Sequence, residues 1–309
     1  QWSLAGVASF VLIRLSSSGV KVRSTDFFVV SGPDWPDPLA ALGGVAAAVI
    51  LGLLIGIPAV KIRGLQLAVI PLVSIVAVED LVMRNKPIMG VASVTTNPTP
   101  EPKWFGQYIG ALDESTYRND YWKYTFFALV VVSLASLLVV NLRRGLTGRR
   151  FLAIRSNERA AAAAGVNVAR TKMLGFGVSS FLAGLAGMLI AYKLPMITSE
   201  NFSPLAGLAM IAFAYIGGIT TVTGAVLGGI LVGGGLISEF SSLHFEGITR
   251  SYINVVGAVG LIVTAIFTSG EGTALSVAKS AKAMVTGMRD SSEEPNIVEE
   301  IHESIEETV

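Results

Sequence analysis

The segment LAALGGVAAAVILGLLIGIPAV at residues 39–60 decides the class of fold, because it is long, apolar and without a charged side chain. An α-helix rises about 1.5 Å per residue, so a helix of this length crosses the roughly 30 Å hydrocarbon core of a bilayer. Comparable apolar segments lie at 121–142, 173–192, 224–240 and 252–268. We therefore predict five transmembrane helices from these segments.

The composition agrees with a membrane protein, since the 309 residues are 52% hydrophobic and only 15% charged, where soluble domains carry about a quarter. Three more apolar segments, 1–16, 65–83 and 205–217, raise the expected number of spans to about eight. Pro71 interrupts one of them, and a broken membrane helix is tolerated mainly beside protein or a water-lined cavity. The predicted fold is all-α, a polytopic transmembrane helical bundle with broken or short helices near 65–83 and 205–217.

Basic residues cluster in one connector, 143–172, which contains a single acid, Glu158. The basic residues are Arg143, Arg144, Arg149, Arg150, Arg155, Arg159, Arg170 and Lys172. Short loops rich in Lys and Arg remain in the cytoplasm, which orients the connector. Alternation then places Lys61 inside, the loop 84–120 and the segment 193–204 outside, and the C-terminus inside a multi-pass protein of the cell membrane.

The two ends of the chain differ from the bundle, which we expect to occupy 1–269. The chain begins at Gln1 within an apolar run, so we expect further membrane helices upstream. The tail 270–309 is rich in acids from Asp290 onward, which is typical of a disordered segment. Isoleucines at 297, 301 and 305 recur at helical spacing, so a short amphipathic helix that docks on a partner is the alternative.

Small residues recur at a spacing of three to four within the apolar segments, where they let helices approach closely. They are Gly52 and Gly56, Gly224 and Gly228, Gly229 and Gly233, and the group Ala183, Gly184 and Gly187. We interpret these patterns as packing surfaces within the bundle or between subunits. The turn with Gly217, Gly218 and Gly224 is either a tight turn between helices or, together with Pro71, part of a gate or hinge.

Enzyme chemistry finds little support in this composition. The chain has no Cys and only two His, so we expect no catalytic residues, no metal site and no cofactor. A phosphate-binding GxxxxGK[ST] loop is missing as well, which leaves any ATP hydrolysis to another polypeptide. The acids Glu79, Asp80 and Glu239 lie near the predicted ends of spans. The sequence allows two positions for them, at the membrane interface or on the path of the solute.

The connector contains a second informative pattern, NERAAAAAG at Asn157–Gly165. An Asn cap, an early Glu and an alanine run predict a short, smooth helix that Gly165 ends. The residues singled out are Arg155, Asn157, Glu158, Arg159, Ala160, Ala161, Ala162, Ala163, Ala164 and Gly165. Such a helix either inserts into a groove of a partner or is a solvated connector whose arginines contact anionic lipid.

Four segments resemble the permease subunits of branched-chain amino-acid ABC transporters, in the same order along the chain. The longest, RRFLAIRSNERAAAAAGVNVARTK at 149–172, continues as MLGFGVSSFLAGLAGML to residue 189. The others are QWSLAG at 1–6, KIRGLQLAV at 61–69 and GGITTVTGAVLG at 217–228. The acidic tail, Pro71 and the outer loop depart from the family pattern.

The resemblance implies a permease of a prokaryotic importer that carries a branched-chain or other hydrophobic amino acid. Its partners would be two cytoplasmic ATP-binding subunits, a second permease subunit (identical or a paralogue), an external solute-binding protein and membrane lipid, with no nucleic acid. Residues 157–165 would be the coupling helix, with Glu158 and the alanines against an ATPase subunit and Arg155 and Arg159 flanking that contact.

Other functions remain open at this stage. A permease of the same superfamily for a sugar, a nucleoside or urea differs only in its cargo. An ion-coupled secondary transporter would need charged or unwound coordination sites near the bilayer midplane, and the predicted spans offer few charges. A purely structural anchor would not need eight spans and four ordered family motifs.

Overall fold

A computed structural model describes the following parts of the chain. These are residues 1–16, 33, 35–61, 73, 76–78, 97–98, 103–104, 107–108, 121–194, 196–197, 199–218 and 222–231. Contacts divide the chain into two compact units, Gln1–Leu208 and Ala209–Val309. Each unit is treated by itself.

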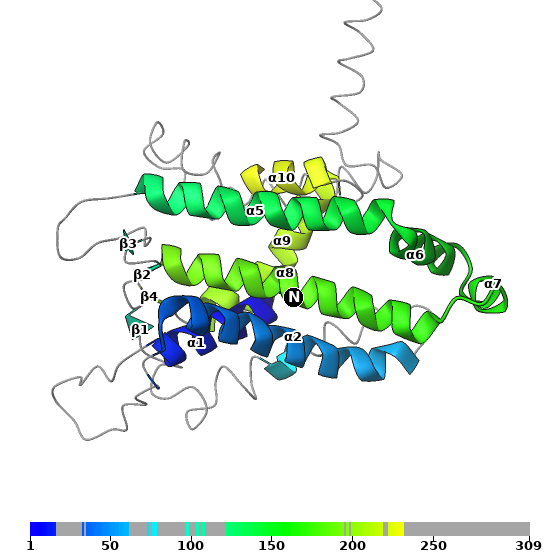
Figure 1. Cartoon of the computed structure of the whole chain (residues 1–309), viewed down its shortest axis with the longest axis horizontal. Helices are drawn as coiled ribbons and strands as arrows, with labels where there is room; N and C mark the ends of the chain where they lie inside the picture. The colour runs from blue at the N-terminus through cyan, green and yellow to red at the C-terminus, as the bar shows by residue number, and fades with distance from the viewer. Residues whose placement is uncertain are drawn as a thin grey trace, which may run out of the picture. The chain divides into compact units, whose positions relative to one another are not determined.

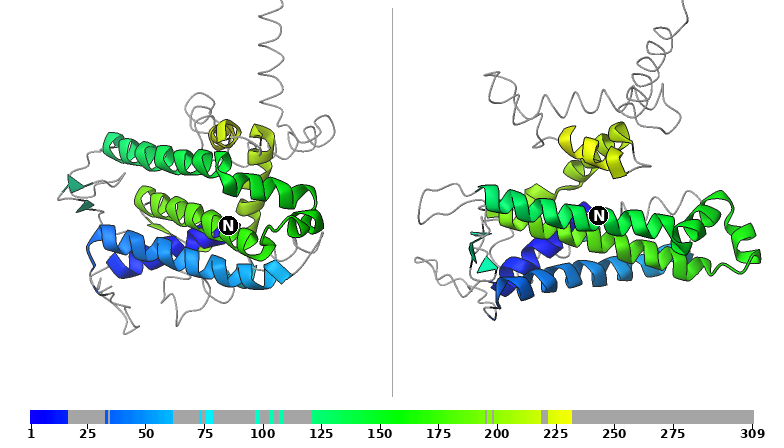
Figure 2. Two further views of the ribbon diagram at one scale, coloured as in Figure 1. Left: turned by 45° about the vertical axis from the view of Figure 1, so that its right-hand side comes forward. Right: turned by 45° about the horizontal axis from the view of Figure 1, so that its top comes forward.

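The first unit is a helical bundle with a helical connector at one end (Figure 1). Its longer described helices and those of the connector are α1 (Trp2–Ser16), α2 (Asp37–Lys61), α5 (Tyr121–Arg144), α6 (Leu146–Ser156), α7 (Glu158–Ala163) and α8 (Val168–Lys193). Helix α8 lies between α2 and α5, and α1 packs against both α2 and α8 (Figure 2). Helices α6 and α7 join the end of α5 to the start of α8.

Within the described residues, three helices are long and apolar enough to cross a membrane: Asp37–Val60, Trp122–Arg144 and Val168–Lys193. They confirm the helices predicted at 39–60, 121–142 and 173–192. The predicted segments 1–16 and 205–217 are also helical, as α1 and as α9 (Pro204–Gly217), but both are shorter than a full span.

Other predicted features lie wholly or partly outside the described residues. Only residues up to Leu231 of the span predicted at 224–240 are described, in α10 (Val222–Leu231). The span at 252–268, the tail 270–309, Gly233 and the acids Glu79, Asp80 and Glu239 lie outside. The described residues therefore establish a helical membrane bundle, and the prediction of about eight spans stays a prediction.

Small residues bring α1, α2 and α8 into close contact, as their spacing predicted. A Cβ added to Gly187 of α8 would overlap the carbonyl oxygen of Ala5 in α1, and one added to Gly52 of α2 would overlap the Ser180 hydroxyl. The buried Ser9 hydroxyl lies 2.7 Å from the Gly187 carbonyl oxygen, to which it donates. The helices are thus held by backbone approach and a hydroxyl bridge, which is how helices associate without a hydrophobic driving force in lipid.

The end of the bundle opposite α7 carries short strands (Figure 1). Strand β1 (Asn97–Pro98) pairs antiparallel with β4 (Met196–Ile197), and β2 (Lys103–Trp104) pairs with β3 (Gln107–Tyr108). The β1–β4 pair brings residues 97–98 and 196–197 together, which agrees with a position of the loop 84–120 and the segment 193–204 on the same side of the membrane. Their position outside the cell stays a prediction. A 3₁₀-helix, η3 (Ser199–Phe202), follows β4.

Aromatic contacts fasten this end to the bundle. The Trp104 ring meets Phe127 of α5 edge-on, with centroids 5.0 Å apart, and its indole N–H donates to the Tyr192 hydroxyl of α8 at 3.3 Å. Trp2 of α1 stacks at a tilt on Phe202, which is fully buried. Indole and phenol groups with one polar and one apolar edge suit the membrane interface, where the sequence placed this loop.

In the second unit, the described helices are α10 and the part of α9 from Ala209 onward. A Cβ added to Gly228 of α10 would lie 2.8 Å from the Phe213 carbonyl oxygen of α9. Of the predicted pair Gly224 and Gly228, Gly228 is therefore a position of close helix packing. A Cβ added to Gly229 would have no atom of a neighbouring element within 4 Å.

Candidate functional site

The basic connector turns twice to place α7 beyond the ends of α5 and α8. At the first turn, Gly148 is buried so close to the Arg143 carbonyl oxygen that any added Cβ would overlap it. The chain then runs through α6, a helix that was not predicted within the basic connector. At the second turn, Asn157 adopts an extended conformation and ends α6 with its backbone N–H on the Ala153 carbonyl.

Asn157 also begins α7. Its side-chain oxygen accepts from the backbone N–H groups of Arg159, at 3.0 Å, and Ala160, at 3.1 Å. These are two of the donors at a helix start that have no partner inside the helix. The helix start predicted at Asn157 is confirmed, and one residue both closes α6 and opens α7.

The other end of α7 is closed by Gly165, as predicted. Its φ of +81° lies in the left-handed region that favours glycine. The Gly165 N–H donates to the Ala162 carbonyl and the Val166 N–H to the Ala161 carbonyl, each at 3.0 Å. This pair of bonds is a Schellman motif, which satisfies carbonyls that a helix end otherwise leaves open.

An ion pair fastens α7 to the membrane helix α8. Lys172 Nζ lies 3.0 Å from Glu158 Oε1, and the two side chains are 11% and 27% exposed. The sequence analysis missed this partner, although Glu158 is the single acid among eight basic residues in the connector. Glu158 therefore contacts α8 of its own chain and stays 27% exposed, and its predicted place against an ATPase subunit stays a prediction.

The outward side of α7 is small and smooth. Ala160, Ala162, Ala163 and Ala164 are exposed, whereas Ala161 is buried at 4% exposure. Arg155 and Arg159 are exposed on either side of Asn157. The structure thus brings the predicted site residues together in one surface, an alanine face flanked by two arginines, with Glu158 and Ala161 turned inward.

The residues predicted as a gate or hinge lie apart from this connector in the sequence, and Pro71 is outside the described residues. Gly217 is the last residue of α9. Gly218 follows with a φ of +109° and donates its N–H to the Ala214 and Tyr215 carbonyls at 3.1 and 3.2 Å. Gly224 is buried in α10. Gly218 has the geometry of a helix-ending glycine, and its role as a hinge remains a prediction.

No metal-binding cluster accompanies this surface in the described part of the chain. There, no three His, Cys, Asp or Glu side chains gather closely enough to hold a metal ion. The connector therefore offers contact chemistry, namely a smooth apolar face, capped helix ends and fixed positive charges. Long apolar helices and a capped surface helix at one end define the class as a helical membrane protein.

Comparison with known proteins gives the family. The family model for the permease component of branched-chain amino acid transport systems matches residues 3–265, and the chain belongs to this family. It is 28% identical over 209 residues to the high-affinity branched-chain amino acid transport system permease protein LivM of Salmonella typhimurium, and equally to that of Escherichia coli. These alignments cover 63% of this chain and 48% of each relative, so the chain spans about half the length of the curated relatives it matches.

Permeases for sugars are also similar. The L-arabinose transport system permease protein AraH of Escherichia coli is 31% identical over 135 residues, 42% of this chain and 37% of the relative. The xylose transport system permease protein XylH of Haemophilus influenzae is 32% identical over 120 residues, 37% of this chain and 32% of the relative. No solved structure matches the chain.

Proposed function

We propose that this chain is the membrane-spanning permease subunit of an ABC importer in a bacterial cell membrane, with a branched-chain or other hydrophobic amino acid as its cargo. ATP hydrolysis would occur in two separate cytoplasmic subunits, and a second permease and an external solute-binding protein would complete the importer. The observation that carries the proposal is the family match over 3–265 combined with the capped helix α7 at the end of a membrane bundle.

In this proposal α7 is the coupling helix. Its exposed alanines fit a groove on an ATPase subunit because they carry no bulk and no polar group that needs a partner. Arg155 and Arg159 would contact acidic positions at the rim of that groove, where guanidinium groups pair well with carboxylates. The Glu158–Lys172 ion pair and the two caps would let α7 move with α8 as a rigid body when the ATPase closes.

A substitution on the alanine face tests this proposal. The full chain would be purified from its native membrane as wild type, Ala162→Arg and Ala169→Arg, and co-purifying proteins identified by mass spectrometry. Ala162 is exposed on α7, whereas Ala169 is exposed in the first turn of α8 outside the alanine face. We expect an ATP-binding protein with the wild type and Ala169→Arg, and its loss with Ala162→Arg. Equal recovery with all three would exclude α7 as the contact.

A sugar is the alternative cargo, favoured by the similarity to the arabinose and xylose permeases. Uptake into vesicles that contain the assembled importer distinguishes the two. Radiolabelled leucine that accumulates only with ATP, without competition by arabinose or xylose, supports the amino-acid cargo. Competition by either sugar, with no uptake of leucine, supports the alternative. An importer that accumulates solute only with an ion gradient would contradict both.

A further inference from the structure

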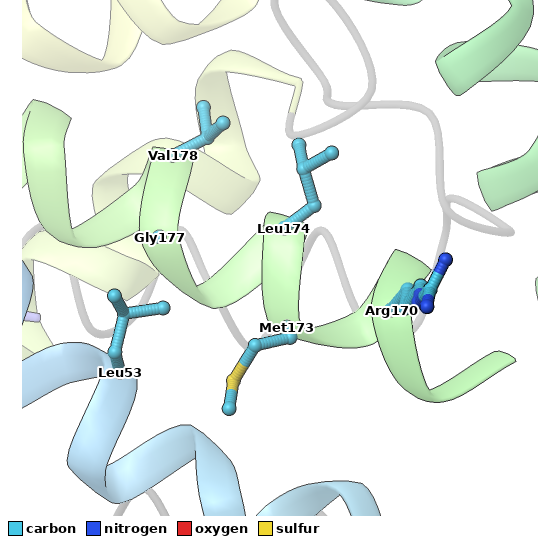
Figure 3. A pocket seen from close by; sticks show the side chains of 6 residues that line it. All are labelled: Leu53, Arg170, Met173, Leu174, Gly177 and Val178. Atoms are coloured by element: carbon cyan, nitrogen blue, oxygen red, sulfur yellow. The ribbon is translucent and has the colours of Figure 1, made fainter. Parts of the chain in front are cut away.

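A groove of about 420 Å³ runs along α8 on the part of its surface near α2, within the first unit (Figure 3). Its described lining is Leu53 of α2 and Arg170, Met173, Leu174, Gly177 and Val178 of α8. All of these residues except Arg170 are apolar. The groove therefore combines an apolar wall with a single cationic group, and Figure 3 shows that group at the end of the row nearest the start of α8.

The order of these residues follows the depth of a membrane helix. Arg170, Leu174 and Val178 are spaced by four and so share one face of α8, with Gly177 beside them. Val178 lies about 12 Å further along the helix than Arg170, at about 1.5 Å per residue. Because Val168–Lys193 is one of the three described helices suited to cross a membrane, we expect the cation at the interface end and the apolar wall in the hydrocarbon.

Arg170 is electrostatically open to a ligand. Its side chain is exposed, and no carboxylate of the described residues lies within ion-pair distance of it. Lys172, two residues later, is by contrast neutralised by Glu158. Leu174, next in the row, is 44% exposed, and Met173, Gly177 and Val178 are partly exposed.

Gly177 keeps the groove open where α8 approaches α2. A Cβ added there would lie 3.4 Å from the Leu53 side chain, an ordinary contact distance. The position therefore has room for a small side chain without a clash, and the space is taken by no described atom. A thin, flexible apolar chain fits such a space.

We propose that this groove binds one anionic phospholipid, with the headgroup phosphate on the Arg170 guanidinium and an acyl chain along Leu174, Gly177 and Val178. The guanidinium matches phosphate in charge and in hydrogen-bond geometry. An apolar groove on a membrane helix meets acyl chains, and the cation selects lipids with net negative headgroups. The proposal requires membrane insertion only and holds for either cargo.

Native mass spectrometry of the 309-residue chain in detergent tests this proposal, with phosphatidylglycerol and phosphatidylcholine as probes. We expect the wild type to bind phosphatidylglycerol more tightly. Arg170→Gln should weaken phosphatidylglycerol about fivefold and abolish the preference, because a basic residue at the interface contributes on the order of 1 kcal/mol. Arg170→Lys keeps the charge and should keep the preference. Gly177→Leu fills the groove and should weaken both lipids.

Arg150→Gln is the matched control, since Arg150 is also exposed in the basic connector but does not line the groove. It should leave both affinities at the wild-type value. Equal losses from Arg150→Gln and Arg170→Gln would show diffuse surface attraction and overturn the site. A wild type with no preference for phosphatidylglycerol would also overturn the site. The same holds for a Gly177→Leu variant that still binds lipid but has a different oligomeric mass. If Gly177→Leu does not fold, the comparison of Arg170→Gln with Arg170→Lys still tests whether the charge of residue 170 selects phosphatidylglycerol.

Discussion

Replacing Lys172 by Met should release helix α7 from α8, because Met keeps the apolar stem of the side chain and removes only the ammonium group. The bond that is lost joins Lys172 Nζ to Glu158 Oε1 over 3.0 Å, with the side chains 11% and 27% exposed. Hydrogen bonds to charged groups contribute about 1.5–3 kcal/mol, and partial exposure reduces this to about 1–2 kcal/mol. The population of detached α7 should therefore rise roughly 5- to 30-fold.

Amide hydrogen exchange measures this population. A helix of six residues is not stable alone, so detachment of α7 should unfold it and expose the amides that now donate within it. We expect amides 160–165 to exchange faster in Lys172→Met by the factor above. Glu158→Gln should have a similar effect, and the double variant should add little because both changes remove the same interaction.

The reasoning would be refuted by unchanged exchange in Lys172→Met. It would also fail if Arg150→Met accelerated α7 equally, since Arg150 is an exposed residue of α6 for which no described carboxylate lies within ion-pair distance. In that case positive charge in general, and not this ion pair, would determine how firmly α7 is held.

Three further substitutions test the packing and the helix end. Gly187→Ala should lower the free energy of unfolding in detergent by about 1–3 kcal/mol, because the added Cβ overlaps the Ala5 carbonyl. Gly229→Ala, the control, should not be destabilising. Equal melting temperatures for the two variants would contradict this. Ser9→Ala should lower the free energy of unfolding by about 0.6 kcal/mol and at most about 1.7 kcal/mol, because it removes the 2.7 Å hydrogen bond to the Gly187 carbonyl. A larger decrease in this free energy than for Gly187→Ala would contradict this. Gly165→Ala forces a φ of +81° on alanine and should destabilise the end of α7 by about 1–2 kcal/mol. The amides at the end of α7 should then exchange faster, and in Gly165→Asn their exchange should be closer to the wild-type rate. Unchanged exchange in Gly165→Ala would argue against the strain.

Local chemistry made α7 predictable in detail. The side chain of Asn157 reaches only the next two or three amides, and Gly165 acts through its own φ and its neighbours' carbonyls. Both signals are complete within nine residues, so no distant part of the chain was needed to read them.

The rest of the connector was less predictable. Helix α6 includes Gly148, which closely approaches the Arg143 backbone. The basic sequence of the connector, without a regular apolar pattern, does not predict this contact. Helix α8 begins at Val168, ahead of the predicted 173, because hydropathy marks the hydrocarbon and misses a polar first turn capped by Asn167. The partner of Glu158 lies 14 residues away and was one of several basic residues within reach.

The sequence by itself determined the membrane class, three of the spans and the bounds of α7. These depend on the solvation of each residue and on its near neighbours, which add up along the chain. Only the tertiary structure decided that Gly187 meets Ala5, that Gly52 meets Ser180 and that Trp104 reaches Tyr192. Such contacts depend on the rotation and register of each helix, and a helix that is apolar on all sides leaves both undetermined until its partners are in place.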